Sequence, residues 1–247
     1  MIRGILVVAS FVLFFIFSLP ILAFLFILRK FKPDTALYIA FRIIKAFLGW
    51  QLFISGTRLI IEGRENIPDD GEAVLFVGNH RSLYDAMVTY RCLKFPTGYV
   101  AKKSLAGIPI MGWWMDMIGS LFLDRQNVRE GLKTILSAID TIKRGTSVFI
   151  FPEGTRNRNE DQDVPMTFKE GSLKIAQKTG CKIIPVAIKD TELCYEANHG
   201  PKVTPQTVRV RLCEPVYIKD IPEEYKKEPA AYIREIIMNV NKEPIAE

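Results

Sequence analysis

The sequence predicts an α/β domain with a largely parallel central sheet flanked by helices, preceded by an N-terminal membrane helix or hairpin. After residue 57, short apolar segments alternate with amphipathic helical segments, which is the pattern of parallel strands joined by crossover helices. Residues 4–28 carry no charge over 25 positions, and roughly 20 apolar residues suffice to cross a bilayer as a helix. We therefore divide the chain into an anchor at 1–33, a helix at 34–56 and a domain at 57–247.

The apolar run at the N-terminus is predicted to be retained rather than cleaved. It is longer than the roughly 7–15 residues of a signal-peptide core, and it ends in Arg29-Lys30-Phe31-Lys32 instead of a small-residue cleavage site. A single span and a shallow hairpin both fit the sequence. The hairpin would break near Ser18-Leu19-Pro20, because proline disturbs a helix interior. In either geometry the basic residues after Leu28 favour a domain on the cytoplasmic side.

The next segment, residues 35–53, is helical in pattern and places Arg42 and Lys45 among many large apolar residues. Such a helix fits a position along the membrane surface, and it fits equally well a place in the core of the domain. The sequence alone leaves both interpretations open.

The elements of the domain follow from apolar periodicity and from turn residues. Strands are predicted at 58–62, 73–77, 147–151, 182–188 and 208–212, and helices at 82–94, 128–144 and 168–178. The strand at 208–212 alternates apolar and basic residues, so we expect it to be half exposed.

The net charge of +6 does not indicate a nucleic-acid partner. Four of the 33 basic residues lie in residues 1–33, which hold no acidic residue, so the rest of the chain has 29 basic and 27 acidic residues. Most of the excess lies beside the apolar run, where anionic lipid headgroups would attract it. The domain has no RNA-binding signature and no long basic stripe.

The cysteines and histidines do not predict a metal site. Cys92, Cys181, Cys194 and Cys213 form no Cys-x-x-Cys pair, and the chain has only two histidines. A zinc site is therefore not expected. Thiols scattered through predicted strands and helices fit a reducing compartment.

Two predicted strands run directly into unusual polar loops. Strand 73–77 leads to Gly-Asn-His-Arg-Ser at 78–82, and strand 147–151 leads to Pro-Glu-Gly-Thr-Arg at 152–156. Sites in parallel sheets form beyond the carboxyl ends of the strands. These two loops are therefore the first candidates for a functional site.

His80 and Asp85 form a candidate acid–base pair. A histidine can take up a proton near neutral pH, and a carboxylate bonded to its second ring nitrogen fixes the tautomer. Residues five apart on one helix do not face each other, so the pair requires that His80 precede the helix. Ser82 and Asp85 also match a helix capping box, which would leave His80 without chemistry. No Gly-x-Ser-x-Gly elbow is present, so the base would act directly on a substrate hydroxyl.

Three segments supply candidate anion-binding groups. Residues 151–156 combine a glycine turn, the hydroxyl of Thr155 and the guanidinium of Arg156, and arginine matches phosphate oxygens bidentately. Arg125 follows an apolar run, and Lys102 lies in a basic pair. Each segment taken alone also fits a solvated polar turn.

Taken together, these segments resemble the glycerolipid acyltransferase family, which includes 1-acyl-glycerol-3-phosphate acyltransferases. Residues 79–85 resemble its first block, the His-x4-Asp (HX4D) motif, and residues 151–156 resemble its third. Residues 119–125 resemble the second block and residues 183–187 the fourth. The four occur in the family's order, and the N-terminal membrane segment also fits. The resemblance implies a fold like that of the glycerol-3-phosphate acyltransferases.

The resemblance also implies roles for single residues. His80 would be the general base for the acceptor hydroxyl, and Asp85 would orient it. Pro185 belongs to a block linked to acyl-donor binding or to the shape of the sheet, and Lys102 is our own addition to the site. The acceptor's glycerol phosphate would be bound by Arg125, Glu153, Gly154, Thr155 and Arg156.

The implied reaction transfers a fatty acyl group from acyl-CoA or acyl-carrier protein to the sn-2 hydroxyl of 1-acyl-sn-glycerol-3-phosphate. The product would be phosphatidic acid, and neither a metal nor a cofactor besides the acyl donor is implied. The implied partners are the lysophospholipid, the acyl thioester and the bilayer. Alternative acceptors are another lysophospholipid, glycerol-3-phosphate or an acylated sugar. A non-catalytic lipid-binding protein is the alternative from another class, and intact His80 and Asp85 count against it. The apolar stretch 105–123 fits an acyl-chain tunnel, lipid contact or simple core.

Overall fold

The structure, a computed structural model, describes residues 1–159, 166–198 and 202–245. Its centre is one sheet of seven strands in the order β1-β7-β6-β2-β5-β3-β4. Neighbouring strands pair in parallel except for β6 and β7, which are antiparallel. The strands are β1 Arg58–Glu62, β2 Leu75–Gly78, β3 Thr97–Lys102, β4 Leu121–Leu123, β5 Ser147–Ile150, β6 Ile183–Lys189 and β7 Thr207–Leu212.

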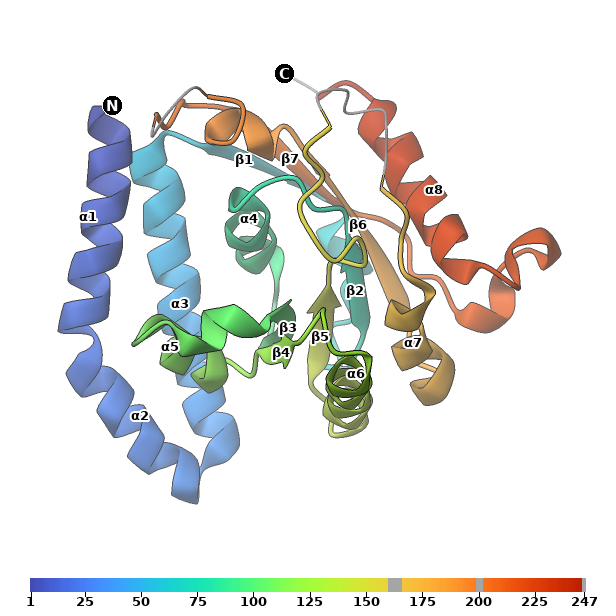
Figure 1. The fold of residues 1–247 in the computed structure, drawn as a ribbon, viewed down its shortest axis with the longest axis horizontal. Helices are drawn as coiled ribbons and strands as arrows, with labels where there is room; N and C mark the ends of the chain where they lie inside the picture. Colours follow the sequence, from blue (N-terminus) through green and yellow to red (C-terminus); the bar gives the residue numbers. More distant parts are fainter. Residues whose placement is uncertain (160–165, 199–201, 246–247) are drawn as a thin grey trace.

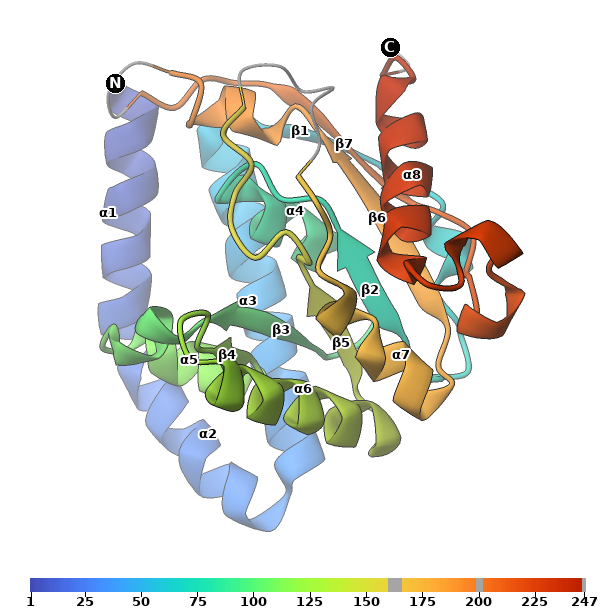
Figure 2. The ribbon, with the colours of Figure 1, turned by 45° about the vertical axis from the view of Figure 1, so that its right-hand side comes forward.

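Helices cover both faces of this sheet (Figures 1 and 2). Helices α3 and α4 lie on one face, and α6, α7 and α8 lie on the other. The arrangement confirms the predicted α/β class with a largely parallel sheet. The helices are α1 Ile2–Phe17, α2 Leu19–Phe31, α3 Pro33–Ser55, α4 Tyr84–Cys92, α5 Met111–Met117, α6 Val128–Lys143, α7 Lys174–Thr179 and α8 Pro229–Lys242.

The alternation of side chains along each central strand produces two separate hydrophobic clusters. Phe76 and Phe149 point into the cluster beneath α3 and α4. Their strand neighbours Leu75, Val77 and Val148 point into the cluster beneath α6, α7 and α8. Because β2 and β5 are central and covered on both faces, every residue in them is buried.

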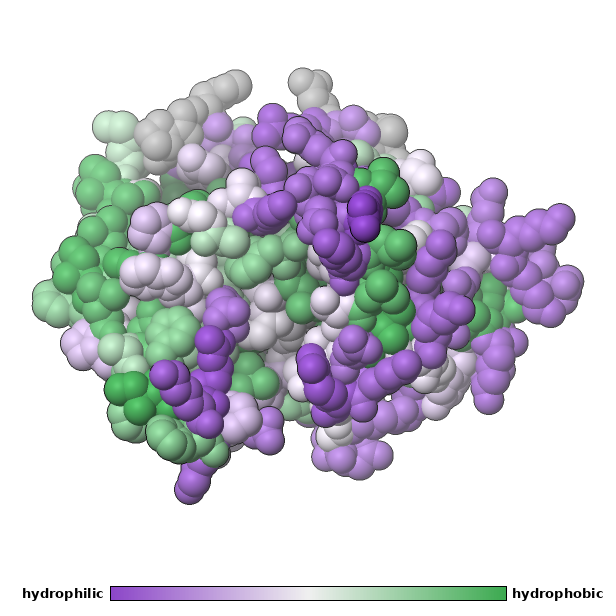
Figure 3. Space-filling view, turned by 60° about the horizontal axis from the view of Figure 1, so that its bottom comes forward, coloured by the Kyte–Doolittle hydropathy of each residue, from purple (hydrophilic) through white to green (hydrophobic). Residues whose placement is uncertain are grey.

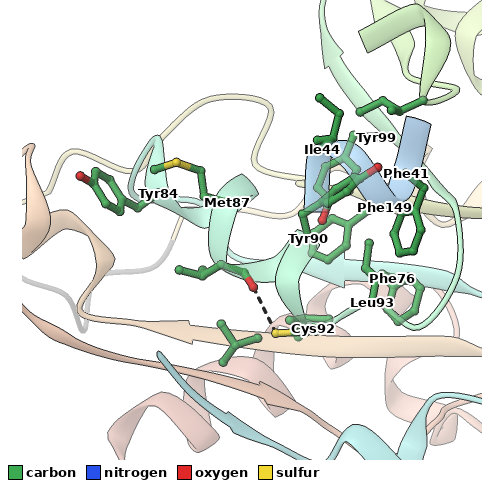
Figure 4. Packing of buried hydrophobic residues seen from close by; sticks show 14 of the residues in the cluster. Phe41, Ile44, Phe76, Tyr84, Met87, Tyr90, Cys92, Leu93, Tyr99 and Phe149 are labelled. Atoms are coloured by element: carbon green, nitrogen blue, oxygen red, sulfur yellow. Dashed lines mark hydrogen bonds between the residues drawn. The ribbon is translucent and has the colours of Figure 1, made fainter. Parts of the chain in front are cut away.

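The cluster beneath α3 and α4 contains a group of aromatic rings that contact one another (Figure 4). The ring of Tyr99 stacks on that of Phe149, with centroids 4.8 Å apart, and Phe149 stacks on Phe76 at 5.9 Å. Phe41 of α3 packs against Tyr90 of α4. These contacts fix α4 on the sheet, and α4 begins directly after the polar loop of β2.

The N-terminal helices bear on the two anchor geometries that the sequence leaves open, a single span and a shallow hairpin. The predicted break occurs at Ser18, but there α1 and α2 are bent by only 51°. The chain reverses later, at Lys32, and α3 runs back beside both helices (Figure 1). Trp114 of α5 donates a hydrogen bond of 2.9 Å from its indole nitrogen to the hydroxyl of Ser18. Arg29 and Asp116 form an ion pair of 2.7 Å, so both helices are tied to α5.

The outer surface of these helices is strongly apolar. Within the described residues, α3 is the one helix that is by itself long and apolar enough to cross a membrane, and the bent pair α1–α2 would count as a second. Figure 3 shows hydrophobic side chains gathered toward the N-terminal helices, while the opposite side is mainly hydrophilic. This surface fits association with a membrane. Its most exposed members are Ile2, Ile5, Val8, Phe17, Phe24, Ile27, Phe31 and Phe53.

Helix α3 combines the two properties that the sequence left open. One face of it, including Ala40, Phe41 and Leu52, is buried in the domain, while Trp50 and Phe53 are exposed. The core contact is therefore present, and a position along the membrane surface stays a prediction for the exposed face.

Several elements differ from their predicted form. The helix predicted at 168–178 is a 3-10 turn at Glu170–Ser172 followed by the short α7. The half-exposed character expected of 208–212 is wrong for Arg209, which is fully buried. Its guanidinium donates to the carbonyls of Val240 and Pro244 at the end of α8, so a buried basic residue holds the last helix. The sequence does not predict strands β3 and β4 or helices α5 and α8.

Candidate active site

The polar loops after β2 and β5 meet at the carboxyl edge of the sheet. The two strands are adjacent and parallel, so their carboxyl ends lie side by side. Asn79 joins the first loop to β6, because its side-chain amide exchanges two hydrogen bonds of 2.8 Å with the backbone of Ile188. The backbone nitrogen of Asn157 donates to the carbonyl of His80 over 2.7 Å, which ties the second loop to the first.

His80 and Asp85 form the predicted pair. Nδ1 of His80 lies 2.8 Å from Oδ2 of Asp85. His80 precedes α4, and Asp85 lies in the first turn of that helix, so the chain turns back between them as the pairing requires. The histidine side chain is 17% exposed and the aspartate is fully buried. With the carboxylate on Nδ1, that nitrogen carries the ring proton, and Nε2 is left to accept another one.

Asp85 is satisfied by four donors. Its Oδ2 accepts from Nδ1 of His80 and from the backbone nitrogens of Arg81 and Ser82, at 2.7 and 2.8 Å respectively. Its Oδ1 accepts from the hydroxyl of Thr191. The bond from Ser82 is half of the predicted capping box. In the other half of a capping box, the Ser82 hydroxyl would accept from the backbone nitrogen of Asp85. In the structure this hydroxyl accepts from the backbone nitrogen of Tyr84 instead. The capping interpretation and the acid–base interpretation thus apply to the same carboxylate.

The His80 ring stacks on a second aromatic ring. It stacks on Phe151 with centroids 4.3 Å apart and planes inclined by 19°. Phe151 in turn packs against Phe149 of the aromatic cluster. The bond to Asp85 and the stack on Phe151 restrain the imidazole, and Nε2 forms no hydrogen bond with any residue that the structure describes. Such a group can accept a proton from a hydroxyl placed beside it.

Glu153 lies beneath the pair rather than on the surface. It is 5% exposed, and its Oε1 accepts from the backbone nitrogen of His80 over 3.0 Å. Burial raises the pKa of Glu153 to about 8, against the opposing effects of that hydrogen bond and of Arg81. The side chain is therefore mostly neutral at pH 7, and it supports the backbone of His80.

Gly154, Thr155 and Arg156, which follow Glu153 in the second loop, are less buried than Glu153. Gly154 adopts φ +75°, which favours glycine, and a Cβ there would lie 2.8 Å from Nζ of Lys169. Thr155 is exposed. Arg156 forms an ion pair of 2.8 Å with Glu196, and their side chains are 28% and 22% exposed.

Lys102 and Arg125 lie at the same edge of the sheet but farther along it. Lys102 ends β3, and Arg125 follows β4. Arg125 follows β4, which lies two positions beyond β5 in the sheet. Neighbouring strands in a sheet are about 4.8 Å apart. Both side chains are exposed, and neither is paired with an acidic residue in the part of the chain that the structure describes. Pro185 lies within β6, beside Val77 of β2, so it contributes to the sheet and not to a loop.

Three neighbours of the candidate site escaped the sequence interpretation. Thr191, Glu192 and Glu196 follow β6, whose carboxyl end lies at this edge. Thr191 bonds to Asp85, and Oε1 of Glu192 lies 3.0 Å from Nε of Arg81. Glu196 contacts Arg156. These residues lie more than 100 positions from the first motif in the chain, and no local pattern marks them. Among residues 1–159, 166–198 and 202–245, no three His, Cys, Asp or Glu side chains gather as metal ligands.

A sequence model described as acyltransferase matches residues 58–189, and the chain belongs to this acyltransferase family. The predicted resemblance is thereby confirmed. The crystal structure of the 1-acyl-sn-glycerophosphate (LPA) acyltransferase PlsC from Thermotoga maritima is similar with a TM-score of 0.79 and 26% identity, covering 100% of this chain and 99% of that one.

Curated relatives are named for the same acyltransferase activity as the Thermotoga maritima protein. The 1-acyl-sn-glycerol-3-phosphate acyltransferase of Borreliella burgdorferi is 34% identical over 160 residues, which is 65% of this chain and 62% of the relative. The enzyme of that name from Escherichia coli is 30% identical over 174 residues and 69% of each chain. The chain spans 62% and 44% of the lengths of the Borreliella burgdorferi and chloroplastic Arabidopsis thaliana relatives.

Proposed function

We propose that the protein transfers a fatty acyl group from an acyl thioester to the sn-2 hydroxyl of 1-acyl-sn-glycerol-3-phosphate, forming phosphatidic acid. The observation that carries this proposal is the bond of 2.8 Å between His80 and the buried Asp85, beside a loop that presents Arg156. Relatives that match 65% and 69% of the chain are named 1-acyl-sn-glycerol-3-phosphate acyltransferase. The donor is acyl-CoA or acyl-carrier protein.

The acceptor is bound through its phosphate and its acyl chain. Arg156 contributes guanidinium donors for the phosphate oxygens. Thr155 offers a hydroxyl, and Gly154 lets the ligand approach the backbone. Glu153, in the same loop, joins it to the loop after β2 by accepting a hydrogen bond from the backbone nitrogen of His80. The acyl chain stays against the apolar surface of the N-terminal helices, so the lysophospholipid reaches the site laterally from the membrane.

His80 acts as the general base. Its Nε2 takes the proton of the sn-2 hydroxyl while the hydroxyl oxygen attacks the thioester carbonyl carbon. Asp85 stabilises the imidazolium that forms. The tetrahedral intermediate then collapses, the carbon–sulfur bond breaks, and the thiolate takes the proton back from Nε2. The products are phosphatidic acid and the free thiol, and no covalent enzyme intermediate is formed.

Lys102 and Arg125 serve the anionic ligands at the rim of the site. They are exposed cations near the end of β3 and after β4. Long-range attraction of this kind raises the rate at which charged ligands arrive. The domain faces the cytoplasm, because Arg29, Lys30 and Lys32 follow the apolar run and basic residues stay on that side.

The test is a direct assay of acyl transfer. Membranes containing the protein are given labelled 1-acyl-glycerol-3-phosphate with acyl-CoA or, separately, with acyl-carrier protein. Labelled phosphatidate from the wild type supports the reaction, and the faster donor identifies the thioester. No phosphatidate with either donor, in a protein shown to be folded, would contradict the assigned acceptor. Glycerol-3-phosphate and other lysophospholipids run in parallel identify the true acceptor in that case.

A further inference from the structure

Glu196 joins the two loops of the site through a single carboxylate. Its Oε1 accepts from NH1 of Arg156 and from the backbone nitrogen of Leu83, both over 2.8 Å. Its Oε2 accepts from the hydroxyl of Ser82 over 2.6 Å. One side chain therefore contacts the guanidinium of the second loop and the turn that separates His80 from Asp85.

The segment that carries Glu196 is itself fixed. After β6, Asp190 adopts the left-handed conformation with φ 66°, which aspartate tolerates at turns, and a 3-10 turn follows at Thr191–Cys194. The nitrogen of Ala197 donates to the carbonyl of Glu192 over 2.9 Å. Thr191 bonds to Asp85 at the start of the same turn. Glu196 is thus held from its own side and does not merely follow Arg156.

The contact with Glu196 leaves most of the N–H donors of Arg156 available to bind a ligand. A guanidinium has five N–H donors in a fixed plane, and Glu196 accepts from NH1 alone. With one edge of the plane held, the other donors have a defined direction before a phosphate arrives. A side chain that is ordered in advance loses less entropy when it binds its ligand.

We infer that Glu196 is a positioning residue, which sets the direction of the Arg156 guanidinium for the acceptor's phosphate and couples it to the loop that carries His80. This inference rests on the proposed acyl transfer. Glu196 lies outside residues 58–189, the part of the chain that the family model matches, so the device goes beyond the shared motifs.

A purely structural role would have different consequences. If Glu196 only stabilised the fold, its loss would lower the melting temperature and affect both substrates alike. A positioning role acts through Arg156, so the effect on the acceptor must depend on whether Arg156 is present. Coupling of this kind is measured by a double-mutant cycle.

The experiment compares E196A, E196Q, R156A and the double variant R156A/E196A in the full-length protein. We expect E196A to raise the KM for 1-acyl-glycerol-3-phosphate about tenfold, the size of effect that a hydrogen bond to a charged group commonly has. The KM for the acyl donor should stay within about twofold. E196Q keeps a carbonyl oxygen toward Leu83 and Arg156 and should restore the acceptor KM to within about threefold of the wild type.

The double-mutant cycle decides the question. In the R156A background, adding E196A should change the acceptor KM by less than about twofold. An equal tenfold rise in both backgrounds would overturn the inference, as would an E196A variant with normal acceptor KM and a lowered melting temperature. Failure of E196Q to restore the acceptor KM would also overturn it.

A matched control lies at the opposite edge of the sheet. Glu72 precedes β2 and forms an ion pair of 2.6 Å with Lys182, which precedes β6. E72A removes a similar carboxylate from a similar pair, and it should leave both KM values within about twofold, since exposed pairs contribute little. If the wild type itself forms no phosphatidate, the proposed function fails, whereas an active wild type with independent Glu196 and Arg156 effects refutes this inference alone.

Discussion

The loop after β2 and the basic residues at β3 and β4 lie at the same edge of the sheet and are built in opposite ways. In the loop, Asp85 is fully buried and bonded to four donors, and His80 is held by Asp85 and by the ring of Phe151. Lys102 and Arg125 are exposed and, within the described chain, unpaired with any acid. The side chains of one region are held by several hydrogen bonds and a ring stack, whereas those of the other lie exposed at the surface.

This difference separates two tasks. A group that moves a proton must be within hydrogen-bond reach of the reacting atom, so small displacements reduce the rate strongly. A cation that attracts a phosphate acts over a longer distance and tolerates movement. Arg156 lies between the two cases, because it binds an anion yet is held by Glu196. Substitutions in the three places should therefore differ in size and in the kinetic constant that they change.

The largest of these effects is expected for Asp85→Asn. The asparagine oxygen can accept the three bonds at Oδ2, and its amide can face the hydroxyl of Thr191, so the loop should keep its shape. The charge that stabilises the imidazolium is lost, and we expect kcat to fall about 10²–10⁴-fold. Steady-state rates at saturating acceptor measure this, with D85N and the wild type compared for melting temperature. A folded D85N protein with near-normal kcat would show that Asp85 serves the helix start alone.

The next effect in size is expected for Arg156. Arg156→Ala should raise the acceptor KM about 10–100-fold, because hydrogen bonds to a charged group are worth more than neutral ones. Arg156→Lys keeps the charge but loses the planar fork, so its KM should fall between those of the wild type and R156A. Initial rates over a range of 1-acyl-glycerol-3-phosphate concentrations give these values. Equal KM values for R156K and the wild type would mean that charge alone matters.

Smaller effects are expected at the rim. Lys102→Ala and Arg125→Ala should each change KM by about two- to fivefold with kcat unchanged, because exposed charges are screened by solvent and salt. Raising the salt concentration should shrink the difference from the wild type. Rates in low and high salt test this. A loss of kcat in K102A would move that residue into the catalytic group.

The smallest effect on turnover is expected for Glu153→Gln, which resembles the neutral form present below pH 8. Its effect should instead be seen in stability. The folded pKa of about 8 lies above the ordinary value of 4.5, so the unfolded chain loses this proton first and stability falls as pH rises from about 5 to 8. Melting temperatures across that range should decline more steeply in the wild type than in E153Q. Parallel curves would show that Glu153 is ionised in the folded protein.

Much of the fold, and the candidate site residues in the loops after β2 and β5, could be predicted from local sequence. Central strands such as β2 and β5 are short apolar runs that end in polar loops, and their order along the chain already implies a parallel sheet. His80 and Asp85 are five residues apart, and their residue types made them a candidate pair that the structure brings into contact, although the spacing alone fitted a helix cap equally well. The family resemblance then supplied the roles that spacing could not give.

The rest depends on contacts between distant parts of the chain. Strand β4 has only three residues, too few for a periodic signal. Arg209 lies in a strand that alternates apolar and basic residues, yet it is buried because the end of α8 and the residues after it supply carbonyl acceptors. Glu196 lies 40 residues from Arg156 and 114 from Ser82. No local pattern announces such partners, since only the folded sheet brings the ends of β2, β5 and β6 together.

The central claim is that His80 is the base for acyl transfer, and the turnover of His80→Ala tests it most directly. Membranes with equal amounts of folded wild-type and H80A protein would receive labelled 1-acyl-glycerol-3-phosphate and the preferred thioester at saturating concentration. We predict that phosphatidate formation falls about 10²–10⁴-fold, with the melting temperature little changed, because the ring is only one of four donors to Asp85. Near-normal phosphatidate formation by H80A would contradict the account.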